Sequence, residues 1–272
     1  MSHVLHPPYY EKNVGPRGKA MVEELIAVVR DMGRELAARQ PDALVVVADD
    51  HLNVFSFDAV PAMCVRIGRS VQRMAQEGAI EFDRALDGLA ERYPLHEELA
   101  GRILEAGLDA GFDFAASWSA PLDHAFLSPL TTLYGDTRMP PLVPFWVNCF
   151  VQPLPRAERC FAAGQHIARV IADSPWDVGV IATGGLSHFP GLSMARVGTS
   201  DAAFDRRIVA SMEHGDYKAL TALTTRELHE SGSHELLNWM VLMGAVAPAR
   251  ARVRFFGEMG RIDLAAVEWP LS

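Results

Sequence analysis

Two apolar runs in this chain of 272 residues each end in a cluster of polar residues. Val178 to Ile181 leads into Thr183-Gly184-Gly185, and His188 follows the glycines within three residues. Ala43 to Ala48 runs directly into Asp49-Asp50-His51. Buried strands that stop in such turns are where α/β proteins present reactive side chains. Two strand ends that each supply a histidine therefore indicate one site assembled from distant parts of the sequence.

Composition excludes several classes of protein. The formal net charge of −9 argues against a nucleic-acid partner, because phosphate binding needs a basic surface. Three cysteines without a Cys-x-x-Cys pair argue against a disulfide framework or a thiolate metal cluster, and they fit a reducing cytoplasm. The first residues do not read as a signal peptide, and no uncharged apolar run reaches the roughly 20 residues of a membrane span. We therefore expect a cytoplasmic globular protein without a membrane partner.

Helical and strand-like segments alternate along the chain. Helical patterns occupy residues 17–40, 95–110, 156–172, 199–212, 216–223 and 233–246, and strand-like runs occupy 43–48, 59–67, 143–151, 178–182 and 252–256. This alternation predicts an α/β fold with a central mixed or mostly parallel sheet flanked by helices. The sequence has no internal repeat and no linker-like tract, so we expect one domain over residues 1–272.

Most of the ten histidines need no special role. Four lie in helical or polar contexts and are predicted to be ordinary surface residues: His96, His166, His214 and His229. His51 follows a strand and two aspartates, which is a better place for chemistry. His124 lies beside Asp123 in what reads as a loop with two prolines, and His3 is at the N-terminus.

Glu235 stands at the head of an almost uniformly apolar segment, Leu236 to Val246. A carboxylate on the first turn of a buried helix needs a partner, because burying an unpaired charge is costly. One interpretation is that Glu235 only complements the helix dipole. The other pairs it with histidines and a divalent metal, since two histidines and one carboxylate are the ligand set of non-haem Fe(II) oxygenases.

Six blocks of the sequence carry a resemblance to a known family. They span residues 2–3, 49–68, 122–130, 143–164, 182–191 and 230–246, in the family's order and over almost the whole chain. With these blocks the sequence resembles the type III extradiol ring-cleaving dioxygenases, the group that contains the catalytic subunit of protocatechuate 4,5-dioxygenase.

The resemblance implies a site. The Fe(II) ligands would be His3, His51 and Glu235, while His188 would act as acid and base and His124 would be a further active-site histidine. Two of the ligand assignments have a competing residue. His6 rivals His3 as the first ligand, because the expected proline two residues after that ligand is a leucine here, and Glu230 competes with Glu235.

The implied activity is extradiol cleavage of a catechol-type ring with O2, on a substrate such as protocatechuate or gallate that can carry a carboxylate. Arg66, Arg196 and Arg206 are candidates to hold that carboxylate, and Asp49, Asp50 and Asp123 could orient imidazoles or serve turns. We expect a homo-oligomer, and a separate small subunit is compatible with the sequence. Two other classes remain: a Memo-like metal-binding or interaction protein, and a metal-dependent hydrolase with the same ligands.

Overall fold

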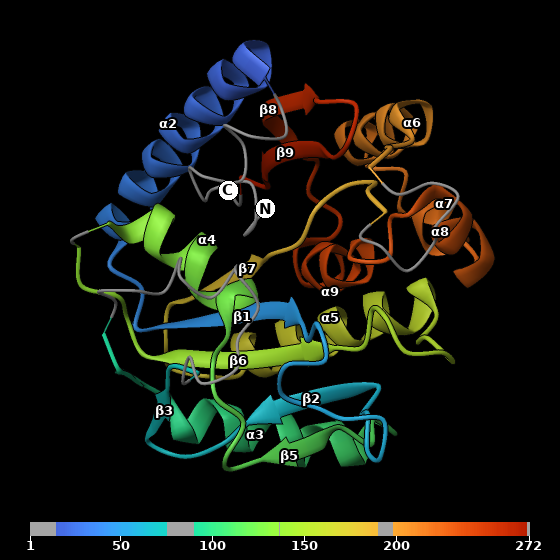
Figure 1. Ribbon diagram of the computed structural model, residues 1–272. Helices are drawn as coiled ribbons and strands as arrows, with labels where there is room; N and C mark the ends of the chain where they lie inside the picture. The colour runs from blue at the N-terminus through green and yellow to red at the C-terminus, as the bar shows by residue number, and fades with distance from the viewer. Residues whose placement is uncertain (1–14, 75–89, 136, 190–197, 271–272) are drawn as a thin grey trace.

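A five-stranded sheet forms the centre of the molecule, in the order β5-β2-β6-β1-β7 (Figure 1). The computed structural model describes residues 15–74, 90–135, 137–189 and 198–270. The strands are β1 (Ala43–Asp49), β2 (Met63–Arg66), β5 (Ala115–Ser117), β6 (Leu142–Val147) and β7 (Val178–Ala182). Strand β1 pairs in parallel with β6 and β7, β2 pairs in parallel with β5, and only the β2–β6 pair is antiparallel. The predicted mixed, mostly parallel sheet is confirmed.

Strand β1 lies between two neighbours and is buried along its whole length. Its side chains alternate between two cores, because successive residues of a strand point to opposite faces. Val45 and Val47 face the core that contains residues of α3 (Glu97–Asp109), α5 (Ala157–Ala172) and α9 (Leu236–Val246). Leu44 and Val46 face the second core, built with α4 (His124–Tyr134) and the end of α2 (Gly15–Arg39). Helices on both faces explain why this strand reads as an uninterrupted apolar run.

Helices α5 and α9 pack with their backbones in close approach. A Cβ atom added to Gly164 would lie 1.9 Å from the carbonyl oxygen of Val241, and one added to Gly244 would lie 1.9 Å from that of Phe161. Any side chain at either position would therefore push the two helices apart. This pair of glycines sets the position of α9, which follows directly on Glu235.

The remaining elements surround this core (Figure 1). They are α6 (Ala202–His214), α7 (Tyr217–Thr221), α8 (Thr225–Ser231), the antiparallel pair β8 (Arg252–Glu258) and β9 (Asp263–Glu268), and the pair β3 (Ser70–Gln72) and β4 (Arg92–Pro94). No helix within the described ranges combines the length and the apolar character that crossing a bilayer requires.

Several predicted boundaries were wrong. The strand expected at 143–151 ends at Val147, because the side chain of Asn148 accepts hydrogen bonds from the backbone amides of Phe150 and Val151 and turns the chain. The strand expected at 59–67 covers only β2, and the helix expected at 233–246 begins at Leu236. His124 does not lie in a loop but is the first residue of α4, where the Asp123 side chain accepts a hydrogen bond from the backbone amide of Ala125.

Candidate functional site

The candidate site lies at the edge of the sheet where the parallel strands β1, β6 and β7 end. Since parallel strands present their carboxyl ends at one edge, the residues that follow them come together in space. His51 lies two residues beyond β1, and His188 lies six residues beyond β7. Glu235 joins them from the residue that precedes α9.

The Glu235 carboxylate contacts both histidines. Its Oε1 atom lies 3.5 Å from Nε2 of His51 and 3.3 Å from Nε2 of His188, and its Oε2 atom accepts a hydrogen bond from the backbone amide of Gly185. Gly184 has φ +118°, and a Cβ atom there would lie 2.9 Å from Cβ of Glu235. The glycines of the turn after β7 therefore let the backbone approach the carboxylate.

The ionisation of the cluster follows from burial and from these contacts. Burial would lower the pKa of His51, but the carboxylates of Asp49 and Glu235 outweigh it and raise that pKa to about 10. Burial raises the pKa of Asp49 to about 6. Burial also acts to raise the pKa of Glu235, yet His188 and His51 hold it well below its usual value. The site therefore stabilises positive charge at the place where these side chains meet.

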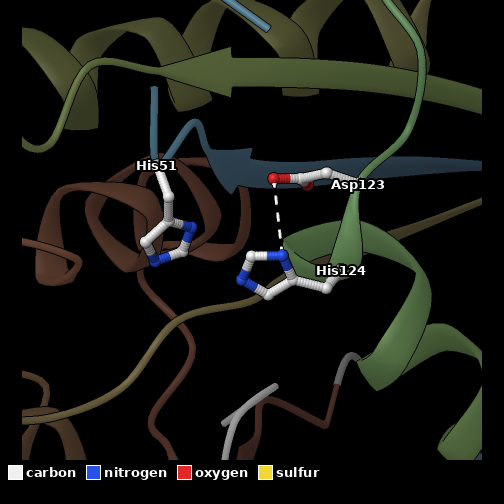
Figure 2. A group of neighbouring side chains, drawn as sticks. All are labelled: His51, Asp123 and His124. Atoms are coloured by element: carbon white, nitrogen blue, oxygen red, sulfur yellow. Dashed lines mark ion pairs between the residues drawn. The ribbon is translucent and has the colours of Figure 1, made fainter. Parts of the chain in front are cut away.

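His124 lies beside His51 as the first residue of α4 (Figure 2). Helix α4 contributes to one core of the sheet, and α9, which follows Glu235, contributes to the other. The two imidazole rings stack with their centroids 4.9 Å apart. Asp123 Oδ2 lies 3.8 Å from His124 Nδ1 and accepts a hydrogen bond from the Asn53 side chain at 2.9 Å. Asp50 instead accepts hydrogen bonds from three successive backbone amides, those of residues 53–55, so it serves the turn after β1.

Two overlapping sets of donor atoms could hold a metal ion in the described part of the chain: Asp49, His51 and Glu235, and His51, Asp123 and His124. Within each set the donor atoms lie within 4.8 Å of one another. A first-row metal with nitrogen and oxygen ligands at about 2 Å separates those ligands by roughly 3 Å, so small side-chain adjustments suffice. Imidazole and carboxylate donors without a thiolate suit a divalent metal such as iron. The residues present therefore fit such an ion.

The structure separates some of the alternatives. Glu230 is exposed and pairs with Arg226 at 2.8 Å, whereas Glu235 is buried and contacts the histidines. His3 and His6 both lie outside the described residues, as does Arg196.

Neither described arginine candidate offers an uncommitted guanidinium to a substrate. The Arg66 guanidinium donates to backbone carbonyls, including that of Ala120 at 3.0 Å, and Arg206 pairs with Glu258.

Sequence reasoning missed His234. It is half-buried, and its ring centroid lies 6.3 Å from that of Phe150. The Phe150 ring centroid in turn lies 5.0 Å from that of His51. Burial lowers the pKa of His234 to about 4. Its position next to Glu235 in the sequence was the signal that could have identified it. The surface prediction for His166 was also wrong, because this residue is buried and its Nε2 lies 3.2 Å from the carbonyl oxygen of Ile103.

Two curated relatives of the chain carry the same name. A protein of Klebsiella pneumoniae (strain 342) named 2,3-dihydroxyphenylpropionate/2,3-dihydroxicinnamic acid 1,2-dioxygenase is 29% identical over 193 residues, which cover 71% of this chain and 57% of that protein. A protein of Mycobacterium sp. (strain MCS) with the same name is 35% identical over 165 residues, 61% of this chain and 48% of the relative. The chain thus spans about half the length of the curated relatives it matches.

The fold also has a counterpart among solved structures. The crystal structure of an uncharacterized protein from Escherichia coli K12 superposes with a TM-score of 0.60 at 18% identity, covering 88% of this chain and 91% of the other. This likeness concerns the fold alone. The family follows from the sequence itself: residues 1–261 match the profile described as the catalytic LigB subunit of aromatic ring-opening dioxygenase, so the expected family is confirmed and the chain belongs to the LigB family.

Proposed function

We propose that this chain is a non-haem Fe(II)-dependent extradiol dioxygenase, which opens the ring of a catechol-type substrate with O2. The observation that carries the proposal is the meeting of one buried carboxylate, Glu235, with the imidazoles of His51 and His188 at the carboxyl edge of a parallel sheet. The family's description, which names an aromatic ring-opening dioxygenase, supports the same chemistry.

In this proposal His51 and Glu235 hold the iron. His3 would be the third ligand, as the resemblance implies, and it lies outside the described residues. Bound Fe(II) would supply the site that brings a catecholate and dioxygen together and passes electron density between them. Glu235 would also offset the positive charge of the metal, because the Gly185 amide fixes one carboxylate oxygen while the other faces the histidines.

His188 would move the proton of a catechol hydroxyl. Its Nδ1 atom lies 3.0 Å from the carbonyl oxygen of Leu186, which can only accept a hydrogen bond, so Nδ1 carries the hydrogen. Nε2, which faces Glu235, is then the nitrogen that gains and loses the proton. His124, stacked on His51 and buried, would line the other side of the bound substrate and assist this transfer.

The substrate class rests on the relatives. Their names point to catechols with a propionate or acrylate side chain, whereas the motifs of the resemblance are also compatible with protocatechuate or gallate. A substrate carboxylate would need a cationic partner other than Arg66 and Arg206. A homo-oligomer in the cytoplasm stays a prediction.

The test is anaerobic loading of the purified chain with Fe(II), followed by oxygen and a panel of substrates. The panel holds catechol, 2,3-dihydroxyphenylpropionate, protocatechuate and gallate, and the readouts are oxygen uptake and the absorbance of ring-opened product. We expect both signals with at least one substrate, and neither in His51→Ala. A wild-type chain that binds iron but consumes no oxygen with any catechol would contradict the oxygenase and favour a metal-binding or hydrolytic role.

A further inference from the structure

Asn238 connects the three strand ends that surround the site. It lies on α9, three residues after Glu235, and its side chain is fully buried. Its Nδ2 atom donates to Oδ1 of Asp49 at 3.0 Å and lies 3.3 Å from the carbonyl oxygen of Thr183. Its Oδ1 atom accepts from the Cys149 thiol at 3.5 Å. These three partners lie at or just beyond the ends of β1, β7 and β6.

The chemistry of the neighbours allows only one orientation of this amide. A carboxylate and a carbonyl both accept, so the NH2 group must face Asp49 and Thr183. Burial raises the pKa of the Cys149 thiol, which therefore keeps its proton and donates to the amide oxygen. An asparagine supplies two donors and an acceptor in one short side chain. Neither aspartate nor leucine, which have nearly the same volume, can do so.

The hydrogen bond from Asn238 fixes the direction of the Asp49 carboxylate. With Oδ1 engaged, the Oδ2 atom of Asp49 is buried, accepts no hydrogen bond from the described residues and lies 3.5 Å from Nε2 of His51. This nitrogen is the same atom that Glu235 approaches at 3.5 Å. Two carboxylates from different elements thus face one imidazole nitrogen, and Asn238 holds one of them in place.

We propose that Asn238 is a positioning residue, which aims the Asp49 carboxylate at the metal position beside His51 and so raises the affinity of the site for a divalent metal. The inference rests on the proposed function, because it takes His51 and Glu235 as ligands. Residues that orient groups around a metal typically contribute 10- to 100-fold in affinity. Loss of the Asn238 amide should therefore weaken metal binding by about that factor.

The experiment measures the dissociation constant of Co(II) alone, by competition with a chromophoric chelator, for the wild-type chain and four variants. Asn238→Leu removes the donor, and Asp49→Asn removes the charge. The double variant Asn238→Asp/Asp49→Asn reverses the two partners and can re-form the hydrogen bond between positions 49 and 238, although the Thr183 carbonyl loses its donor. Cys149→Ala is the matched control, because it removes a contact of Asn238 that does not involve Asp49.

We expect Asn238→Leu and Asp49→Asn to bind Co(II) about 10- to 100-fold more weakly and Cys149→Ala to bind within about twofold of wild type. The double variant should recover part of the thermal stability lost in Asn238→Leu, because one of the two hydrogen bonds re-forms. It should not recover the Co(II) affinity, because its negative charge no longer faces His51. If Asn238 had a purely structural role, the double variant would recover stability and Co(II) affinity together, and that result would overturn the proposal.

Two further outcomes keep the test decisive. If Asn238→Leu does not fold, wild-type affinity in Asp49→Asn would overturn the proposal, since that variant keeps the shape of the side chain. A wild-type chain that does not bind Co(II) would overturn both this inference and the metal site. The wild type could instead bind Co(II) tightly, and the variants could weaken that binding as expected, while the Fe(II)-loaded wild type cleaves no ring. That result would contradict only the proposed reaction.

Discussion

At the scale of single residues, the two histidines that contact Glu235 differ in their surroundings. His51 belongs to both donor sets of the described residues, whereas His188 belongs to neither. Nδ1 of His188 is held by the Leu186 carbonyl, which leaves Nε2 for proton exchange. This difference supports a ligand role for His51 and a proton-transfer role for His188.

We therefore expect His188→Ala to keep iron near the wild-type level while its kcat for catechol cleavage falls by about 10²- to 10⁴-fold. Metal analysis checks the iron content, and single-turnover ring cleavage checks the loss of activity. His214→Ala, which changes an exposed histidine of α6, is the control and should match wild type. An iron-free His188→Ala protein would make His188 a ligand, and full activity would remove it from the mechanism.

Asp205 offers a prediction about pH and stability. This buried carboxyl accepts hydrogen bonds from the amide and hydroxyl of Ser187, and burial raises its pKa to about 7 from the ordinary 3.8. Between these two pH values the folded chain holds a proton that the unfolded chain has lost. The free energy of unfolding therefore falls as pH rises from about 4 to 7, with a slope of up to about 1.4 kcal/mol per pH unit for one proton.

Asp205→Asn mimics the protonated form and should flatten this part of the pH dependence. Urea unfolding at pH 4.5, 6 and 8 measures it, and Asp109→Asn, at an exposed position on α3, should keep the wild-type profile. An unchanged slope in Asp205→Asn would show that another group carries the dependence.

At the scale of elements, the contact between α5 and α9 leaves no room for a side chain at Gly164 or Gly244. We expect Gly164→Ala to destabilise the chain by about 1–3 kcal/mol or more, because its Cβ atom would lie 1.9 Å from the Val241 carbonyl oxygen. Gly101→Ala on α3 is a matched control, since no atom lies within 4 Å of its added Cβ, and alanine there should be neutral or stabilising. Thermal unfolding of both variants tests the contrast, and equal stabilities would contradict it.

How well an element was predicted depended on how much of its structure is decided locally. Strands β1 and β7 match their predicted ranges to within a residue, because both begin and end where an apolar run does. Helix α4 was predicted as a loop because it contains Pro129, which costs about 3 kcal/mol in a helix interior. The buried side chains of Phe126, Leu127 and Leu130 outweigh that cost through tertiary packing, which no local pattern reveals.

At the scale of the whole molecule, the site joins elements that are far apart in the sequence. The resemblance to a family supplied His51, His124, His188 and Glu235 as a group, and the structure brings these four together. Asn238 was missed, although it is the polar exception in an apolar helix, because its partners depend on the order of the strands in the sheet. That order is a global property of the fold and cannot be derived from one segment.

Metal binding should stabilise the entire fold, because the proposed ligands come from separate elements. At a free metal concentration 100 times Kd, linkage contributes about 2.7 kcal/mol, which corresponds to a rise in Tm of roughly 5–10 °C for a chain of this size. Differential scanning calorimetry with Co(II), and again after a chelator, measures the rise and its reversal. His51→Ala should melt at the same temperature with and without the metal, and a rise equal to that of wild type would exclude His51 as a ligand.

The central position of β1 has a consequence for hydrogen exchange. Strand β1 is bonded to a neighbour on each edge and is covered by a core on each face, so the amides of Val45 to Val47 can exchange only when the sheet itself opens. Asp49 is the last residue of this strand, and His51 follows two residues later. We therefore expect the β1 amides to be among the slowest to exchange in the described part of the chain, and both side chains are attached at or just beyond the end of this strand. A substrate that binds at this edge would therefore meet the Asp49 side chain on a backbone that stays in place from one turnover to the next, with His51 only two residues further along.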